Sequence, residues 1–358
     1  MIAAWDAHPG VLSPVGRSIV EQLAEGPPRQ PLAGFEPVYR DIVDYIIRCT
    51  HRIWEAKNIG LCRTHYAADC HLHTLGGPAI GVETVVQNTI GALAVYADRV
   101  VLGEDVIWSE DAPGSYYSSH RIISRATQMG DEGGVRMATL RTGGARTIAD
   151  CLVRENRIVE EWLVRDTLVA LWMVGADHQA VAAAQAQADC AGDQSRHDWR
   201  TAAIAAVRRG GGIVPGVAHP AALPARMLAL AFDDDLYGDA AALLSPSAEI
   251  RWPANRHGFG RGYWTGCMTQ LRAALHDVAF RVDHVAARPL PHGDVAVALR
   301  WSLAGVHAGG GVWGPASGRD VLIMAVSHYR LRGGIIIEDI TVFDELAVLR
   351  QVMGGLGA

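Results

Sequence analysis

The chain has 358 residues, of which 49 % are hydrophobic and 20 % are charged, the composition of an ordinary globular protein with apolar material for two cores. Its formal net charge is −6 and its Lys and Arg residues form no run, which argues against nucleic acid as a partner. No segment reaches the roughly 18–20 apolar residues that cross a membrane, and six cysteines without a CxxC pair suggest reduced thiols, so we expect a cytoplasmic protein.

The first half of the chain predicts helices followed by strands. Residues 1–34 are rich in Pro and Gly, lack the pattern of a signal peptide, and are expected to form an arm on the first domain. Apolar residues recur every three to four positions over 36–57, which predicts an amphipathic helix. Alternation predicts a strand at 69–74, and a second helix is expected at 82–97. A short helix is expected after Asp166, preceded by strands at 99–108, 116–126, 135–141, 146–154 and 158–166.

The second half repeats this order. Helices are predicted at 221–237 and 263–275, with a strand at 247–252 between them. A last helix is expected after Asp344, preceded by strands near 278–287, 294–307, 319–331 and 335–343. The segment 177–220 between the halves is Ala-rich at its start, where it could be helical, and Gly-rich at its end, which is typical of a flexible linker.

The two halves also match residue by residue. Asp344 lies 344 − 166 = 178 positions after Asp166, and at the same offset Glu160 meets Glu338. This match indicates an internal repeat. We therefore predict an α+β protein made of two tandem cone-shaped barrels, each a curved antiparallel sheet wrapped around helices, with a pocket between sheet and helices. The expected domains are 35–176 and 221–358.

The second half resembles the SnoaL-like polyketide cyclases, members of the cone-shaped superfamily named after nuclear transport factor two. The similar segments are VALRWSLAGVHAGG, GPASGRD, HYRLRGGIIIED and VFDELAVLRQ, at 297–310, 314–320, 328–339 and 342–351. Val306 and Ala316 stand where the family often has Thr, whereas Pro315 is kept. The first half is similar through SSHRIIS and RTIADCLVRENRIVEEWLVRD, at 118–124 and 146–166, but it lacks a clear Pro-Thr-Gly loop. The superfamily includes cyclases, isomerases, dehydratases, epoxide hydrolases and members without catalysis, so the resemblance specifies fold better than reaction.

Asp166 ends the last predicted strand of the first half, and Asp344 directly follows the last predicted strand of the second half. Alternation places Asp166 on the same face as Glu160, Trp162 and Val164. If that face lines the cone, burial raises the pKa of Asp166 above about 3.9 and suits it to take a proton next to a carbonyl. The resemblance implies the same role, because the acid at this position is the proposed general acid/base of SnoaL-like cyclases. The alternative is structural, since an Asp before a helix is a preferred N-cap.

Two histidines in the first half form an HxH pair. His71 and His73 point to one side of their predicted strand, and His120 on another strand could complete a zinc site. The family usually works without metal, so we expect no metal and no cofactor. A proton shuttle or carbonyl anchor in the pocket and a satisfied structural histidine are the alternatives for His71 and His73. Trp252 occupies the place of His73 in the second half, at an offset of 252 − 73 = 179.

Further candidates lie on the predicted strands. His120 and Arg121 are adjacent in one strand, so only one can enter the pocket; an Arg there would orient an anionic or carbonyl group, and otherwise it is a surface cation. His307 stands at the Gly-Thr-His-like turn of the family, and His328 opens its Tyr-Arg strand. Tryptophans are more often core residues than ligand platforms. The expected substrate-binding residues are His71, Trp54, Trp162, Trp252, Trp301, His307 and His328.

The chain contains no GxSxG, Walker or GxGxxG motif, which excludes serine hydrolases, P-loop kinases and dinucleotide enzymes. We therefore expect a cofactor-independent cyclase, isomerase, lyase or hydratase, with Asp166 or Asp344 moving a proton on a carbonyl-containing small molecule. His73, His120 or Arg121 would polarise the carbonyl. The alternative is a non-catalytic protein that binds small ligands in two pockets. We expect no membrane partner, and either an internal pseudo-dimer of the two repeats or a homodimer.

Overall fold

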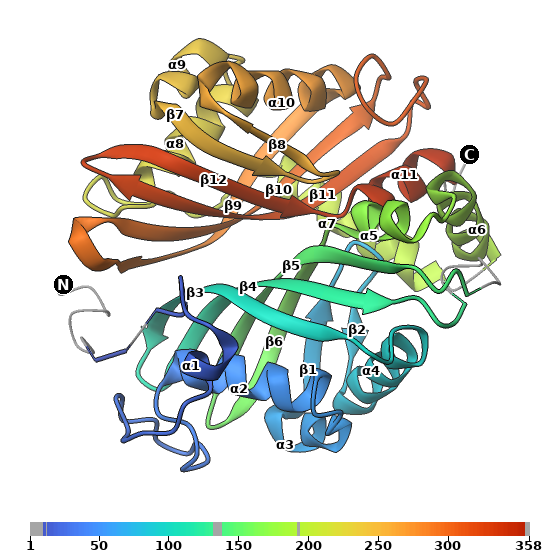
Figure 1. The fold of residues 1–358 in the computed structure, drawn as a ribbon. Coiled ribbons are helices and arrows are strands. Elements are labelled where there is room, and N and C mark those ends of the chain that lie inside the picture. Colours follow the sequence, from blue (N-terminus) through green and yellow to red (C-terminus); the bar gives the residue numbers. More distant parts are fainter. Residues whose placement is uncertain (1–9, 12, 132–137, 192–193, 355–358) are drawn as a thin grey trace.

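The computed structural model describes residues 10, 11, 13–131, 138–191 and 194–354. It contains two six-stranded sheets, one from each half of the chain, and each is covered on its outer face by helices (Figure 1). The inner faces of the two sheets pack against each other. We call the part up to Val174 the first unit and the part from Ala222 the second unit.

The first unit combines four α-helices beside its sheet with a short helix in the arm. The helices are α1 Ile19–Gln22, α2 Ile42–Trp54, the 3-10 helix η2 Ile59–Leu61, α3 Cys62–His65, α4 Val82–Val95 and α5 Thr167–Val174. The strands are β1 Tyr66–His73, β2 Ala79–Ile80, β3 Val100–Ala112, β4 Ser115–Thr127, β5 Thr142–Arg154 and β6 Arg157–Arg165.

The second unit repeats this succession after two connecting helices, α6 His178–Ala191 and α7 Gln194–Arg208. Its helices are α8 Ala222–Phe232, α9 Tyr237–Ala242, α10 Gly260–Ala274, the 3-10 helix η3 Pro291–Gly293 and α11 Glu345–Met353. Its strands are β7 Leu244–Trp252, β8 Arg256–Phe259, β9 Leu275–Pro289, β10 Val295–His307, β11 Asp320–Arg332 and β12 Ile335–Phe343.

The two sheets have the same topology. Their strand orders are β2-β1-β6-β5-β4-β3 and β8-β7-β12-β11-β10-β9. The predicted pair of tandem α+β units is confirmed, with two corrections: the curved sheets are open rather than closed barrels, and each contains one parallel pair, β1 with β6 and β7 with β12. Hairpins force the other long strands to be antiparallel, whereas β1 and β6 are far apart in sequence and no short turn fixes their direction.

The central strands of each sheet are buried on both faces. In the first unit one face packs under α2, around Tyr45 and Val153. In the second unit the corresponding face packs under α8 and α10, around Trp264 and Trp301. The opposite faces meet between the units, where Ile107 contacts the small residues Ala286, Ala296 and Ala298. The central strands therefore carry apolar residues on both sides, as strands buried on both faces do.

Some predicted elements differ from the observed ones. The first long helix begins at Ile42 rather than near residue 36, because Asp41 is its N-cap and accepts a hydrogen bond from Asp44 N. The strand expected at 135–141 is wrong in its described part, since 138–141 form a loop; 135–137 lie outside the described residues. The charged middle of the connecting segment is a helix, α7, because its apolar side packs on β9, β10 and β11 between the units.

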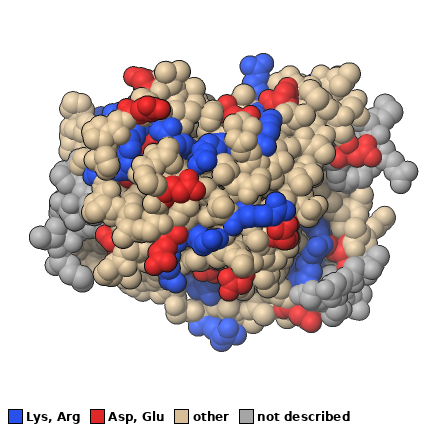
Figure 2. All heavy atoms as spheres, turned by 90° about the horizontal axis from the view of Figure 1, so that it is seen from below, with Lys and Arg blue, Asp and Glu red and all other residues tan. Residues whose placement is uncertain are grey.

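Charges on the surface are mixed. On the face shown in Figure 2, acidic and basic side chains alternate and no continuous basic stripe is visible. No helix in the described part of the chain combines the length and the apolar character that crossing a bilayer requires.

Candidate active site

The interior of the second unit holds a buried acid surrounded by hydrogen-bond donors. Asp339, on β12, has no exposed surface. Its Oδ2 accepts the indole N–H of Trp252 at 3.1 Å and that of Trp264 at 2.9 Å. Its Oδ1 accepts the hydroxyl of Thr341 at 2.7 Å. Three donors from three elements, β7, α10 and β12, thus fix the carboxyl group in one orientation.

The electrostatics of Asp339 suit proton transfer near neutral pH. Burial raises the pKa of Asp339 to about 6, although the hydrogen bonds from Thr341, Trp252 and Trp264 lower it and partly offset the burial. An acid with a pKa near the working pH can both take and return a proton.

More polar groups lie beside Asp339 on the same face of the sheet. Tyr329, on β11, is its cross-strand partner. The hydroxyl of Tyr329 is buried beside the hydroxyl groups of Ser327 and Thr341, and it makes no hydrogen bond of standard geometry within the described residues. Ser327, two residues earlier on the same face, accepts the indole N–H of Trp301 at 2.9 Å and bonds Thr341 Oγ1 at 2.7 Å. Asp339 is therefore part of a polar network inside an otherwise apolar cone.

A small hollow opens above this network. Its volume is about 10 Å³, room for roughly one water molecule. One ion pair closes its rim: Arg256 binds Glu345, and Trp313 donates its indole N–H to Glu345 Oε2 at 3.3 Å. Trp252 connects the hollow to the polar network, since it lines the hollow and donates a hydrogen bond to Asp339. The lining residues are Trp252, Arg256, Cys267, Gln270, Leu271, Val312, Trp313, Phe343 and Glu345.

The chain positions the rim through a tight turn. Trp252 ends β7 and pairs with Arg256, which begins β8. Between them, Ala254 and Asn255 have φ values of +59° and +57°. Two consecutive residues in this left-handed region reverse the chain sharply, as in hairpin turns. Trp252 and Arg256 are thereby held side by side at the rim.

The first unit has a different acid at the corresponding position. Glu161 on β6 lies at the same offset of 178 before Asp339, since 339 − 161 = 178. It is buried, burial raises its pKa, and its Oε2 accepts the hydroxyl of Tyr66 at 3.0 Å. Its cross-strand partner is Cys151, where the second unit has Tyr329. The two interiors therefore share a buried acid but differ in the groups around it.

The comparison of registers corrects one expected match. Leu72 pairs with Glu161, and Ile250 pairs with Asp339. The residue equivalent to Trp252 is therefore Thr74 rather than His73. The offset of 179 was one too large, and a shift of one residue moves a side chain to the other face of a strand.

Asp166 and Asp344 lie at the junction between the units rather than inside a cone. Asp344 caps α11 by accepting Ala347 N at 3.0 Å, and Thr167 of the first unit donates to its Oδ2 at 2.9 Å. Asp166 instead accepts the backbone N–H of Ala254 at 3.1 Å. Burial, opposed by this bond and reinforced by the charges of Glu345 and Asp344, raises the pKa of Asp166 to about 6.

The HxH pair lies on the face that meets the second unit. His73 bonds Glu160 at 2.9 Å and stacks on Trp162, and the guanidinium carbon of Arg300, from the second unit, lies 3.5 Å from the centre of the same indole. His71 is exposed, with its ring 6.4 Å from that of His73. Trp162 is thus held between a histidine and an arginine at the unit interface.

His120 and Arg121 face opposite sides of β4. The ring of His120 lies near Gly103, next to Ile47 of α2, where a Cβ on Gly103 would come 2.9 Å from Nε2. Burial lowers the pKa of His120 to about 3. Arg121 faces the second unit and binds Glu104. His120 is therefore on the other face of the sheet from His71 and His73, and the described residues contain no group of three or more His, Cys, Asp or Glu arranged to hold a metal ion.

The remaining candidates are spread over the molecule. Trp252 and Trp301 lie inside the second cone, and His307 bonds Ser317 at 3.0 Å in the loop that carries Trp313. His328 contacts Ser119 across the interface at 2.8 Å. Trp54, on α2, stacks with the guanidinium of Arg99. The structure thus brings together Trp252, Trp301 and His307 around one unit, and separates them from the other predicted residues.

Sequence reasoning missed Asp339 and Glu161. Each follows by one position Glu338 or Glu160, the acids that the repeat matched, and therefore points to the opposite face. The signal that could have found them is the repeat itself, since an acid recurs at this position in both halves.

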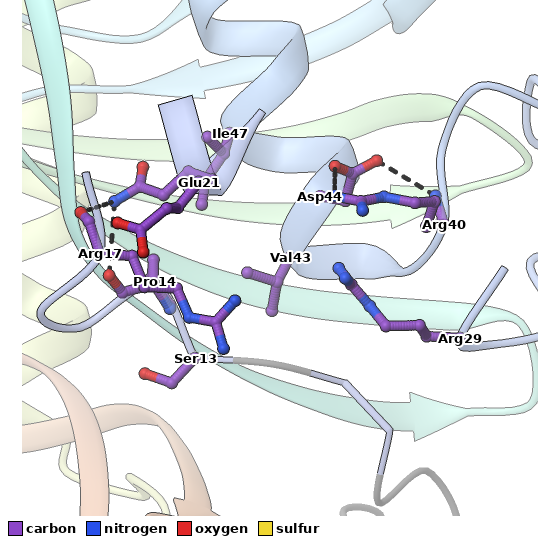
Figure 3. A pocket seen from close by; sticks show the side chains of 10 residues that line it. Ser13, Pro14, Arg17, Glu21, Arg29, Arg40, Val43, Asp44 and Ile47 are labelled. Atoms are coloured by element: carbon purple, nitrogen blue, oxygen red, sulfur yellow. Dashed lines mark hydrogen bonds and ion pairs between the residues drawn. The ribbon is translucent and has the colours of Figure 1, made fainter. Parts of the chain in front are cut away.

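A second hollow lies in the first unit between the N-terminal arm and α2 (Figure 3). Its volume is about 20 Å³. Arg40 binds Asp44, and Arg29 binds Asp41, so carboxylates balance these arginines. The hollow lies where the arm packs on the unit. Its lining residues are Ser13, Pro14, Arg17, Glu21, Gln22, Arg29, Arg40, Val43, Asp44 and Ile47.

Comparisons with known proteins give one family. The family model of the SnoaL-like polyketide cyclases matches residues 224–352. No curated protein matches the chain. Among solved structures, wild-type IdmH, a putative polyketide cyclase from Streptomyces antibioticus, is 21 % identical with a TM-score of 0.32, covering 37 % of this chain and 97 % of its own. AclR, a putative hydroxylase from Streptomyces galilaeus, is 18 % identical with a TM-score of 0.32, covering 37 % and 92 %.

TsrD from Streptomyces laurentii is 14 % identical with a TM-score of 0.34, covering 38 % of this chain and 96 % of its own. The matched segment 224–352 spans α8 to α11 and contains Asp339, both of its indole donors and the whole rim of the hollow. The second unit therefore matches the model of the SnoaL-like polyketide cyclase family over residues 224–352, and it is joined to a first unit built from the same succession of strands and helices.

Proposed function

We propose that the chain is an enzyme of the small-molecule cyclase or isomerase type, with Asp339 as its general acid/base. The SnoaL-like domain supports the reaction class. The observation that carries the assignment is the environment of Asp339, a fully buried carboxyl group with a pKa of about 6 held by three donors at 2.7–3.1 Å.

The proposed chemistry is proton transfer next to a carbonyl. Ionised Asp339 takes the proton from the carbon beside the carbonyl, and the electron pair of the broken C–H bond moves to the carbonyl oxygen. The buried hydroxyl of Tyr329 is the donor that would stabilise this oxyanion. In an isomerisation, the oxyanion reforms the carbonyl and Asp339 returns the proton to a different carbon of the conjugated enolate. In a cyclisation, the enolate carbon attacks a second carbonyl, the first carbonyl reforms, and Asp339 gives its proton to the alkoxide oxygen formed at the second carbonyl.

Substrate access is part of this proposal. Asp339 has no exposed surface, and the hollow above it has a volume of about 10 Å³. A substrate therefore enters only when the side chains of Trp252 and Trp313 move. Trp313 is half-buried and held by one indole hydrogen bond of 3.3 Å, which makes it the more readily displaced of the two.

The other candidate function is a protein that binds small apolar ligands without catalysis. A cavity lined only by apolar side chains would favour this binding function. Asp339 instead has three polar groups within hydrogen-bond distance. The roles expected for Asp166, Asp344, His73, His120 and Arg121 remain predictions. Among them Asp166 contacts the rim directly, because it accepts the backbone N–H of Ala254 in the turn between Trp252 and Arg256.

The test uses an enolisable ketone that needs no knowledge of the native substrate. Deuterium exchange at the activated carbon of β-tetralone is followed by NMR for the wild type and for Asp339→Asn. We expect the substitution to lower the protein-dependent exchange by about 10²–10⁴-fold. Asp320→Asn, which changes an exposed acid that binds Arg208 at the surface, is the matched control. Wild-type protein that binds the ketone without accelerating exchange would instead support the ligand-binding function.

A further inference from the structure

Three arginines surround one buried carboxylate where the connecting helices meet the last helix. Asp189 in α6 accepts hydrogen bonds from Nε and Nη2 of Arg350 in α11, and from Nη1 of Arg196 in α7. Arg200, one turn further along α7, has its Nη2 3.8 Å from Asp189 Oδ2, too long for a hydrogen bond. Figure 1 shows α6 and α11 side by side in this region.

The charges of this arginine cluster do not balance. Three guanidinium groups meet Asp189, the one carboxylate that pairs with them within the described residues. Burial raises the pKa of Asp189, but the hydrogen bonds from Arg350 and Arg196 outweigh it and hold the pKa below its usual value. Asp189 is therefore an anion, and among the described residues two of the three guanidinium charges have no carboxylate of their own. A surplus of charge away from water is unfavourable unless another ion compensates it.

Arg200 has buried hydrogen-bond donors without acceptors in the described residues. Its side chain is 10 % exposed, and its Nε and Nη2 are buried without a hydrogen-bond partner in the described residues. Burial lowers the pKa of Arg200, Asp189 opposes this, and the charges of Arg350 and Arg196 add to the lowering. Nearly all buried N–H groups in proteins are satisfied, so two free donors on one buried guanidinium call for an acceptor.

The cluster can be reached from solvent through Arg196. Its side chain is 44 % exposed, whereas that of Arg350 is 13 % exposed. The turn after β1 covers the other side, since a Cβ on Gly77 would lie 3.1 Å from Arg196 Nε and one on Gly76 would lie 3.6 Å from Arg350 Nη1. Arg196 is therefore the member of the cluster most exposed to solvent.

We propose that this arginine cluster is a binding site for a tetrahedral dianion of the phosphate class, held by Arg200, Arg196 and Arg350. Two negative charges equal the surplus, and planar guanidinium groups bind phosphate oxygens through paired N–H donors. The ion supplies the acceptors that Nε and Nη2 of Arg200 lack. It also links α7 to α11, and so joins the connecting helices to the SnoaL-like domain at a place separate from Asp339.

Thermal unfolding of the whole protein tests the site. Inorganic phosphate at about 10 mM is compared with sodium chloride of equal ionic strength, and phenyl phosphate forms a second arm. We expect phosphate to raise the Tm by about 2–4 °C, because a ligand that binds only the folded state stabilises it. A shift with both phosphates indicates recognition of the phosphoryl group, and a shift with the inorganic ion alone indicates a site for the free ion. Equal Tm values in phosphate and chloride overturn the proposal.

Substitutions separate ion binding from a purely structural role. Arg200→Leu removes the free donors and one surplus charge, so the phosphate shift disappears while the Tm without phosphate stays equal or rises. Arg208→Leu, at an exposed position of the same helix, keeps the full shift. A lower Tm of Arg200→Leu with the phosphate shift intact contradicts the proposal. If Arg200→Leu does not fold, Arg196→Leu at the exposed position serves instead and must lose at least half of the shift.

Discussion

Trp252 donates its indole N–H to Asp339 Oδ2 at 3.1 Å while its ring lines the hollow above that carboxyl group. One side chain thus touches both the space that a substrate would enter and the group that would act on it. This relationship lets the surroundings of the rim influence the ionisation of a buried acid, and it leads to the first prediction.

Replacing Trp252 by Phe raises the pH at which the site becomes active. The indole N–H stabilises the ionised form of Asp339, so its loss moves the pKa of Asp339 upward from about 6. We expect the midpoint of the pH–rate profile for ketone exchange to rise by about one unit. Trp172→Phe, at an exposed position, leaves the midpoint in place. An unchanged midpoint in Trp252→Phe would show that Asp339 does not set the profile.

Asp339 also makes stability depend on pH in a direction opposite to that of a paired surface acid. Its folded pKa of about 6 is higher than the unfolded value near 3.9, so the folded state holds the proton more tightly. The contribution of Asp339 to the free energy of unfolding is therefore fully present below about pH 4. It falls by roughly 2–3 kcal/mol as the pH rises through about 6.

Asp339→Asn removes this dependence, because the amide has no charge to bury and its oxygen still accepts the two indole N–H groups. Urea unfolding at pH values between about 4 and 7 measures the effect. The stability of the wild type relative to Asp339→Asn is expected to fall as pH rises and to level off above pH 7. A difference that stays constant over this range contradicts the raised pKa.

The repeat and the succession of elements could be predicted from sequence, whereas the functional face of each sheet could not. Period-two alternation assigned Glu160 and Trp162 to one side and Glu161 to the other, but it did not say which side meets the helices. Usually the more apolar side of a strand is the one that packs under the helices. Here Val164 and Val342 pack between the units while Leu163 and Phe343 pack under the helices, so both sides are apolar. Only the packing of one unit on the other distinguishes them.

Asp166 and Asp344, the matched acids of the repeat, both lie at the junction between the units. Asp166 holds the turn that carries Trp252 and Arg256, through the 3.1 Å bond from Ala254 N. We expect Asp166→Ala to be less stable than Asp166→Asn by about 1–2 kcal/mol, because only Asn keeps an acceptor for this N–H. Chemical unfolding at about pH 7.5 measures the difference. Equal stabilities of the two variants would mean that the bond contributes nothing.

The unit interface contains a buried ion pair that can be tested by a double-mutant cycle. Arg288 binds Asp105 and donates from Nε to the carbonyl of Val106 at 2.8 Å. Arg288→Met leaves Asp105 buried without its partner, which we expect to lower the free energy of unfolding by about 3–5 kcal/mol. Adding Asp105→Leu should recover most of this loss. A double variant as unstable as Arg288→Met would show that the ion pair is not what couples these residues.

The most direct test of the proposed function is the rate of deuterium exchange into β-tetralone catalysed by Asp339→Asn, measured beside the wild type at a pH well above 6. The variant is expected to fold, since Asn fills the same space and keeps the indole bonds, and to lose the exchange activity by at least about 100-fold. Wild-type activity that survives in Asp339→Asn would contradict the assignment of Asp339 as the acid/base.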